Sequence, residues 1–275
     1  MTFFDPGPAF RALHKPGDPF ILANAWDAGS AKVLHALGAQ AIATTSAGHA
    51  FTIGKGDGGQ VTRDEALAHA EDLVRATPLP VSGDFENGYA EAPEDVAETV
   101  RLACEAGLAG CSIEDTALPD ETPYDFDLSV ERIRAACAAR DTLPRNFVLV
   151  ARADGCMLRT YDTAEAIRRL KAYEAAGADC LYAPLPKSVE DLRQICLSTN
   201  KPINALAAGP KYAAMTRADF AALGVARISV GSALASVTQK ALLDAAGPML
   251  ENGDFSGLLQ RAPGDVIEKM MRGEG

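Results

Sequence analysis

The chain has 275 residues, of which 48% are hydrophobic and 23% are charged, so it can bury a large core, and extensive disorder is disfavoured. Its 37 acidic residues outnumber its 26 basic residues, which gives a formal net charge of −11. A chain this acidic is a poor ligand for phosphate backbones, so we expect no nucleic-acid partner.

Neither the N-terminal sequence nor any internal segment indicates export or membrane insertion. No window holds the roughly 18 apolar residues that a membrane helix requires, and Met1–Pro6 lacks a basic region followed by an apolar run. The six cysteines lie in apolar patterns and no two are spaced C-x-x-C, which favours reduced, buried thiols over a zinc site or a redox pair. We therefore expect a cytoplasmic protein with no membrane partner.

One pattern recurs along the chain: a helical segment ends at a glycine, and a short apolar strand begins within two or three residues. It occurs at Gly38, Gly107, Gly177 and Gly224. Such a glycine is typical of the position after a helix, where the backbone must turn left-handed. Roughly 70 residues separate the first three glycines, which leaves room for two β-α units in each interval.

Eight apolar segments are predicted to be strands buried on both faces. Because they alternate with helical patterns, we predict the α/β class and a (β/α)8 barrel (TIM-barrel) fold rather than an open, doubly wound sheet. The segments are Phe20–Asn24, Ala41–Ala43, Leu79–Asp84, Gly110–Ile113, Phe147–Arg152, Cys180–Tyr182, Pro202–Leu206 and Arg227–Val230.

The helices between these strands begin at recognisable signals. Thr62–Glu65 resembles an N-terminal capping box, Pro93 is followed by acids in a first helical turn, and Thr163 opens the helix that ends at Gly177.

The chain continues beyond the eighth strand. Residues 232–249 are predicted to form a long apolar helix, and residues 255–272 a further helical segment. No linker or shift in composition divides the sequence, so residues 1–275 are predicted to form one barrel domain, with residues 250–275 as a C-terminal helical tail.

Charged residues gather where several predicted strands end, which is the face on which barrels of this class carry function. Asp84 and Glu86 follow the third strand, Glu114 follows the fourth, and Arg152 ends the fifth. Converging carboxylates repel one another unless a cation lies between them, and Mg²⁺ prefers oxygen ligands while keeping several waters. The turn Ser46-Ala47-Gly48, after the second strand, offers a hydroxyl and backbone N–H donors for an anionic oxygen.

A purely structural explanation competes with this one. Acids that follow strands often cap helices, and Glu114 could form a structural ion pair with Arg152. Capping does not explain Asp84 and Glu86, however, because the next helix begins later, near Pro93.

Three further residues have both a functional and a structural interpretation. His49 lies in a loop of the predicted site and could be an acid or base, although one histidine in a loop is weak support for catalysis. Lys187 could form a Schiff base, but it follows Pro186 at a helix start, which is typical of a solvated side chain. Trp26 either lines the site or packs beneath it.

At these positions the sequence resembles the isocitrate lyase/phosphoenolpyruvate mutase superfamily. The resemblance extends from about Phe20 to the helix after Gly231, and it rests on five segments taken together. They are Asn24–Asp27, Thr45–Gly48, Asp84–Tyr89, Ile113–Asp115 and Val150–Asp154.

The resemblance implies a Mg²⁺ site, with Mn²⁺ as an alternative ion. Asp84 would contact the ion directly or through a water, and Glu86, Glu114 and Asp57 would hold its waters.

By the same resemblance, Arg152 and the Ser46-Ala47-Gly48 turn would bind a small 2-oxo acid. The segment Thr116–Asp127 resembles the mobile lid of the family. Members of the family are homodimers or homotetramers that exchange the last barrel helix, which here is Ser232–Met249.

Departures from the family pattern bear on the reaction. The pattern D-x-D-x-G-Y/F-G becomes Asp84–Ala90, with Glu86 at the second acid and Ala90 at the last glycine. The lid lacks the K-[KR]-C-G-H motif, and therefore the catalytic Cys, of isocitrate and methylisocitrate lyases. Pro184 stands roughly where the members that handle phosphonates have a His.

These observations predict a Mg²⁺-dependent lyase with a short lid. It would cleave a carbon–carbon bond of a 2-oxo acid, or of another carboxylic acid that yields pyruvate, through a metal-stabilised enolate. The alternatives are an enzyme that breaks the P–C bond of phosphonopyruvate or carboxyphosphonate, and a catalytically weak protein that binds 2-oxo acids.

The predicted roles fall into three groups. The catalytic residues are Arg152, Glu114 and Ser46. The substrate-binding residues are Ser46, Ala47, Gly48, Asp84, Arg152, Trp26 and Asn204. The metal-binding residues are Asp84, Glu86, Glu114 and Asp57.

Overall fold

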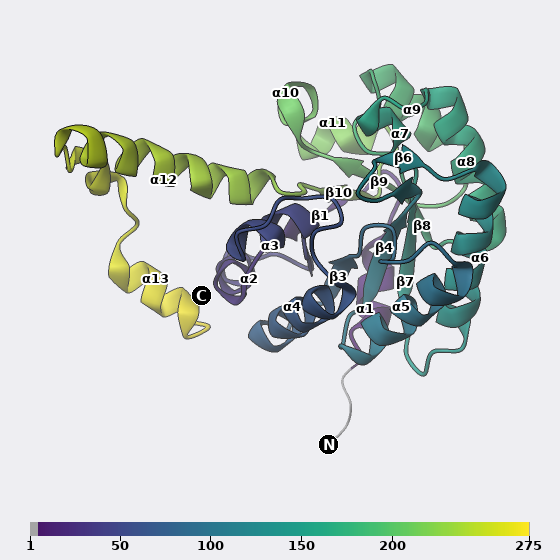
Figure 1. Ribbon diagram of the computed structural model, residues 1–275, viewed down its shortest axis with the longest axis horizontal. Coiled ribbons are helices and arrows are strands. Elements are labelled where there is room, and N and C mark those ends of the chain that lie inside the picture. The colour runs from purple at the N-terminus through teal and green to yellow at the C-terminus, as the bar shows by residue number, and fades with distance from the viewer. Residues whose placement is uncertain (1–4, 275) are drawn as a thin grey trace.

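The computed structural model describes residues 5–274 and shows a closed barrel of eight parallel strands (Figure 1). Around the barrel the strands follow the order β1-β10-β9-β8-β7-β4-β3-β2. The predicted (β/α)8 architecture is therefore confirmed. The strands are β1 (Phe20–Asn24), β2 (Ile42–Ala43), β3 (Val81–Asp84), β4 (Gly110–Glu114), β7 (Val148–Arg152), β8 (Cys180–Tyr182), β9 (Ile203–Leu206) and β10 (Arg227–Ser229).

Helices surround the barrel, and the first of them packs against its N-terminal end through Phe10. They are α1 (Gly7–Leu13), α2 (Ala28–Ala36), α3 (Ser46–Thr52), α4 (Arg63–Ala76), α5 (Pro93–Glu105), α6 (Phe126–Asp141), α7 (Gly155–Leu158), α8 (Thr163–Ala176), α9 (Val189–Leu197), α10 (Gly209–Tyr212) and α11 (Arg217–Ala222). The tail holds α12 (Ala233–Asn252), the short 3-10 helix η1 (Ser256–Gln260) and α13 (Gly264–Met271).

The predicted helix boundaries agree with the structure because local chemistry determines them. Thr62 and Glu65 form a reciprocal capping box at the start of α4. Gly177 ends α8 with φ +106°, a left-handed conformation that costs glycine little.

The inner face of the barrel has a core of its own, separate from the core between strands and helices. Phe10 and Phe20 lie toward its N-terminal end, and Leu22, two residues further along β1, reaches the cavity above them. Higher up, several inward positions carry small residues, among them Ala43, Ser82 and Ser112. Small side chains at alternate strand positions leave a hollow at the C-terminal end of the barrel.

The segment after β4 folds over this hollow. Strands β5 (Thr116–Ala117) and β6 (Thr122–Pro123) pair as an antiparallel hairpin, and α6 begins directly after it. The predicted lid, Thr116–Asp127, is therefore a short hairpin joined to the start of α6.

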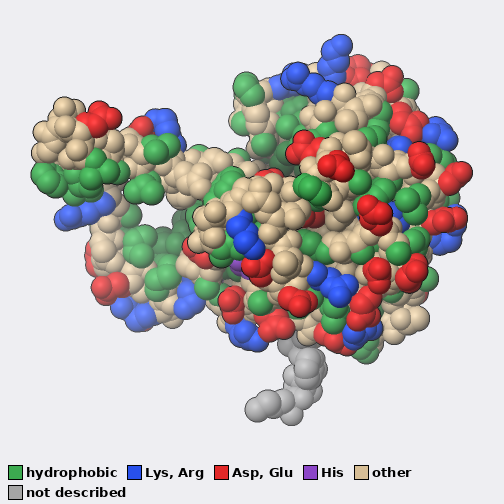
Figure 2. All heavy atoms as spheres, in the orientation of Figure 1, with side chains coloured by type: hydrophobic (Ala, Val, Ile, Leu, Met, Phe, Trp, Pro, Cys, Tyr) green, Lys and Arg blue, Asp and Glu red, His purple; other side chains and the backbone are tan. Residues whose placement is uncertain are grey.

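The C-terminal helices leave the barrel. Helix α12 projects away from the other helices as an arm, and α13 turns back toward α2, where Lys32 Nζ donates to the carbonyl of Met271 (Figure 1). Ile21, on the outer face of β1 beside β10, is 50% exposed, so the outer face of the barrel is left open there. Figure 2 shows hydrophobic side chains along the arm and an open gap between it and the barrel.

Among the helices formed by residues 5–274, none is both long and apolar enough to cross a membrane.

Candidate active site

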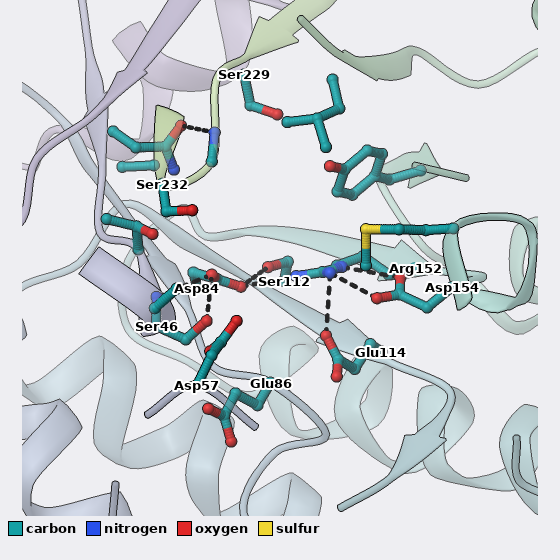
Figure 3. A pocket seen from close by; sticks show the side chains of 18 of the residues that line it. Ser46, Asp57, Asp84, Glu86, Ser112, Glu114, Arg152, Asp154, Ser229 and Ser232 are labelled. Atoms are coloured by element: carbon teal, nitrogen blue, oxygen red, sulfur yellow. Dashed lines mark hydrogen bonds and ion pairs between the residues drawn. The ribbon is translucent and has the colours of Figure 1, made fainter. Parts of the chain in front are cut away.

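A cavity of about 200 Å³ opens at the C-terminal ends of the strands (Figure 3). Its size suits a small acid with a few waters. Side chains from β3, β4 and β7, the α3 turn, the loop 54–59 and the lid hairpin surround it. The predicted residues on its wall are Ser46, Ala47, Asp57, Asp84, Glu86, Glu114 and Arg152.

Asp84 lies at the centre of this group. Its Oδ2 accepts from both the backbone N–H and the hydroxyl of Ser46, each at 3.1 Å. Its Oδ1 accepts from Arg152 Nη1 at 2.8 Å and from the hydroxyl of Ser112 at 3.4 Å. The Asp84 N–H donates to Thr44 Oγ1 at 2.7 Å, which fixes the end of β3. The carboxylate is thereby held where β2, β3, β4 and β7 meet.

Glu86 and Asp57 approach Asp84 from the other side of the group (Figure 3). Glu86 is 4% exposed and has φ +45°, a strained conformation for a side chain of this size. Burial, and next the nearby Asp84, raise the pKa of Glu86 to about 7. Asp57 is exposed as a whole residue, but it lines the cavity. Loss of water around its carboxyl there, and next the nearby Asp84, raise the pKa of Asp57. Protonation of such crowded acids relieves the same repulsion that a cation would relieve.

Arg152, at the end of β7, lies between three carboxylates and contacts each of them. Its Nη2 lies 3.1 Å from Glu114 and 2.6 Å from Asp154, and its Nη1 contacts Asp84 (Figure 3). Burial opposes the charge of Arg152, but Asp154, Glu114 and Asp84 outweigh it and raise the pKa of the guanidinium. Burial raises the pKa of Glu114 well above its ordinary value, although Arg152 acts in the opposite direction.

Asp115 supports this arrangement from behind the barrel wall. It is 3% exposed and accepts from the backbone N–H of Asp154 at 2.9 Å and from Tyr161 Oη at 2.7 Å. Arg169, from α8, lies 3.0 Å from the same carboxylate. Asp115, held by Arg169, therefore links the residue after Glu114 to the backbone of Asp154.

The carboxylate oxygens in this cavity are the kind of ligand that suits a hydrated Mg²⁺ ion. All the candidate ligands are carboxylates, which are the ligands that Mg²⁺ prefers. Within residues 5–274, however, no three acidic, His or Cys side chains already lie close enough to coordinate one ion. The arrangement therefore suits an ion that keeps most of its waters, with the crowded carboxylates accepting hydrogen bonds from those waters.

The lid hairpin contacts the loop that carries Asp57. Leu118 packs so closely on Gly59 that a Cβ there would lie 3.0 Å from the Leu118 Cβ, and Gly59 has φ +77°. Glu121, at the tip of the lid, is exposed, lines the cavity and also has a positive φ of +52°.

Three residues that the sequence predicted for the substrate site do not line the cavity. Gly48 is buried against Thr45 and Trp26, where a Cβ would lie only 2.5 Å from Thr45 Cγ2. Trp26 lines a separate surface hollow, and its carbonyl accepts from His69. Asn204 is fully buried beneath the cavity wall.

Two residues for which the sequence left a catalytic role open, His49 and Lys187, lie outside the cavity. His49 stacks on His69, with ring centroids 3.9 Å apart, and lies in the same surface hollow as Trp26. Lys187 is exposed, and its carbonyl accepts from Lys211.

Sequence reasoning missed the wall opposite the acids. Tyr182, Arg227 and Ser229 line the cavity there, from β8 and β10. The alternation of inward and outward residues along each strand could have identified Tyr182 and the pair Arg227 and Ser229 as neighbours.

Comparison with known proteins identifies the family. Residues 10–250 match the family model described as phosphoenolpyruvate phosphomutase. The chain is 34% identical to an oxaloacetate decarboxylase from Rhodopseudomonas palustris, over 73% of this chain and 72% of that one. It is 33% identical to a 2-methylisocitrate lyase from Salmonella typhimurium, over 70% of this chain and 65% of that one. It also resembles the crystal structure of a candidate lyase/mutase from Burkholderia cenocepacia, with a TM-score of 0.91, 44% identity and coverage of 96% and 94%.

The buried pair behind the site yields a stability prediction. Arg169→Met should lower the free energy of unfolding by roughly 3–5 kcal/mol, because it leaves the carboxylate of Asp115 buried without its cation. Urea unfolding measures this loss.

The neighbouring Arg168 provides the control. It pairs with Glu165 on the exposed side of α8 and is 55% exposed, so Arg168→Met should cost about 1 kcal/mol or less. Equal losses in the two variants would show that the buried pair has no special role.

Proposed function

Since the chain belongs to the phosphoenolpyruvate phosphomutase family of the isocitrate lyase/phosphoenolpyruvate mutase superfamily, we propose that it is a Mg²⁺-dependent carbon–carbon lyase. Its substrate is a 2-oxo acid, or another small carboxylic acid that yields pyruvate. The bond breaks by decarboxylation or by retro-aldol cleavage. Decarboxylation of a 2-oxo acid at C3, or retro-aldol cleavage of a 4-hydroxy-2-oxo acid, leaves the electron pair on a pyruvate-type enolate. Retro-aldol cleavage of a 2-hydroxy acid instead releases pyruvate as the carbonyl product and leaves the electron pair on the enolate of the second carboxylic acid.

One observation carries the proposal. Asp57, Asp84, Glu86 and Glu114 line a single small cavity with Arg152 at one end of the barrel. A structural network of this kind would pair each acid with a base, yet Arg152 alone serves both Asp84 and Glu114. The uncompensated charge fits a site for a divalent cation.

The chain's own residues hold the acidic group in position. The hydroxyl and N–H of Ser46 hold Asp84 in place, and Arg152 sets the positions of Asp84 and Glu114. Mg²⁺, held by Asp84 and by waters on Asp57, Glu86 and Glu114, would supply Lewis-acid stabilisation of the developing enolate oxygen. Leu118 and Glu121 of the lid limit the entry of water.

A second reaction, cleavage of a P–C bond, is favoured by the description of the matching family. The sequence after β8, Ala183-Pro184, offers no His to such a reaction. Release of phosphate from phosphonopyruvate, compared with formation of pyruvate from oxaloacetate or from methylisocitrate-like acids, distinguishes the two reactions.

The protein acts as a homo-oligomer that exchanges α12. The arm exposes Val237, Leu242, Leu243 and Leu250, and the barrel leaves Ile21 open beside β10, where the arm departs. The apolar helix of one copy can cover the open apolar face of the barrel in a second copy, and the reverse, so that both surfaces are buried.

The metal proposal predicts the effect of one substitution. Asp84→Asn should weaken Mg²⁺ binding roughly 10–100-fold and abolish Mg²⁺-dependent binding of oxalate, because it removes the charge at the centre of the group. Isothermal titration calorimetry with Mg²⁺ and oxalate measures both.

The matched control is Asp72→Asn, at an exposed position of α4, which should bind both ligands like the original protein. Unchanged binding in Asp84→Asn would refute the site assignment. Tight binding of oxalate without turnover of any acid would instead identify a binding protein.

The exchange proposal is tested by the mass of the protein in solution. Leu242→Asp combined with Leu243→Asp should convert the oligomer to a monomer, because it places charge in the apolar contact. Light scattering after size-exclusion chromatography gives the mass.

The control is Leu197→Asp on α9, at a leucine that is 78% exposed and lies away from the arm (Figure 1). A monomeric unsubstituted protein, or a double variant that stays oligomeric, would contradict helix exchange.

A further inference from the structure

Arg227 is a buried cation on the wall of the cavity opposite the acids. It begins β10, is 3% exposed and lines the cavity together with Ser229. Figure 3 shows Ser229 and Ser232 across the cavity from Asp57 and Glu86.

The guanidinium of Arg227 has unusually few partners. Its Nε donates to Asn204 Oδ1 at 2.9 Å, while its Nη1 is buried without any hydrogen-bond partner. Among residues 5–274, no carboxylate forms an ion pair with it. Burial lowers the pKa of Arg227 because nothing nearby fully offsets the cost of desolvation.

Other buried arginines of the chain are satisfied. Arg169 pairs with Asp115, and Arg132 donates to the backbone carbonyls of Asn87, Ala90 and Glu91. A buried guanidinium that lacks such partners is costly, so Arg227 needs an anion that the chain itself does not supply.

Arg152, the other guanidinium in the cavity, is already engaged. Its Nε and both Nη atoms contact Asp154, Asp84 and Glu114. It therefore serves chiefly as a counter-charge to the acids, and Arg227 is the guanidinium left for an incoming anion.

The surroundings of Arg227 position it. Asn204 accepts from its Nε and donates through Nδ2 to the hydroxyl of Ser229 at 2.9 Å, so these three side chains form one bonded group. Tyr182 lines the same wall. The cavity therefore has two halves. The acidic half fits a cation, and the other half, which holds neutral groups and Arg227, fits an anion.

We propose that Arg227 binds a second carboxylate of the substrate and so selects dicarboxylates over monocarboxylates. This inference rests on the proposed function, in which one end of the substrate lies at the Mg²⁺ held by the acidic group. A chain of few carbons suits the cavity volume of about 200 Å³. Asn204 is a positioning residue for the guanidinium.

The test compares two stable acids that differ in one group. Malate carries a carboxylate where 2-hydroxybutyrate carries a methyl, and both can bind through their 2-hydroxy acid end. With Mg²⁺ present, the unsubstituted protein should bind malate about 10–100-fold more tightly, and Arg227→Met should abolish that preference. Calorimetric titration gives all the dissociation constants.

Oxalate is the internal control, because it occupies only the metal end. Arg227→Met should change its dissociation constant by less than about threefold, which also shows that the variant is folded. Arg227→Lys, which keeps the charge but loses the fork, should retain part of the preference. Arg217→Met, at an exposed arginine that pairs with Asp18, should change nothing.

Three results would overturn the inference: no preference for malate in the unsubstituted protein, a preference that survives Arg227→Met, or an equal loss of oxalate and malate binding in both Arg227 variants. Failure of the unsubstituted protein to bind oxalate with Mg²⁺ would instead refute the proposed function itself.

Discussion

The structure depends on one constraint: carboxylates from neighbouring parallel strands must meet at the same end of a closed barrel. Asp84 ends β3 and Glu114 ends β4, and these two strands are parallel neighbours. The fold therefore brings two negative charges together at the C-terminal end of the barrel. Burial, and next the nearby Asp84, raise the pKa of Glu86 to about 7. Arg152, at the end of β7, offsets only part of the charge of these acids. The proposed Mg²⁺ site follows from that remaining charge.

The cavity has two halves: the acidic half fits a cation, and the half that holds Arg227 fits an anion. Small residues on the inner faces of β2, β3 and β4 leave room for ligands, and the buried Asp115–Arg169 pair keeps the acidic side rigid from behind. The opposite wall holds Arg227 on a support of Asn204 and Ser229. A buried guanidinium whose Nη1 lacks a hydrogen-bond partner costs stability in the free protein, as residues that await a ligand commonly do.

Much of the fold and the acidic half of the site could be predicted from the sequence, because they depend on local and periodic signals. Gly177 marked the end of a helix, and the order of strands placed Asp84 and Glu114 together. The sequence also offered the ion pair of Glu114 with Arg152 that the structure shows. The separation of Trp26 from the cavity, the burial of Asn204 and the contacts of Arg152 with Asp84 and Asp154 could not be predicted, since they depend on side-chain directions and on the exact placement of neighbouring side chains. Arg227 could not be predicted as a site residue because it begins its strand, whereas the functional side chains of such barrels are expected where the strands end.

The central claim is that this cavity, with Mg²⁺ bound, stabilises an enolate of pyruvate. Exchange of the pyruvate methyl protons for deuterium in D₂O, followed by proton NMR, measures enolate formation without knowledge of the natural substrate. The account predicts exchange that requires both the protein and Mg²⁺ and that stops when EDTA is added. A folded protein that binds Mg²⁺ and oxalate but never exchanges these protons would contradict it.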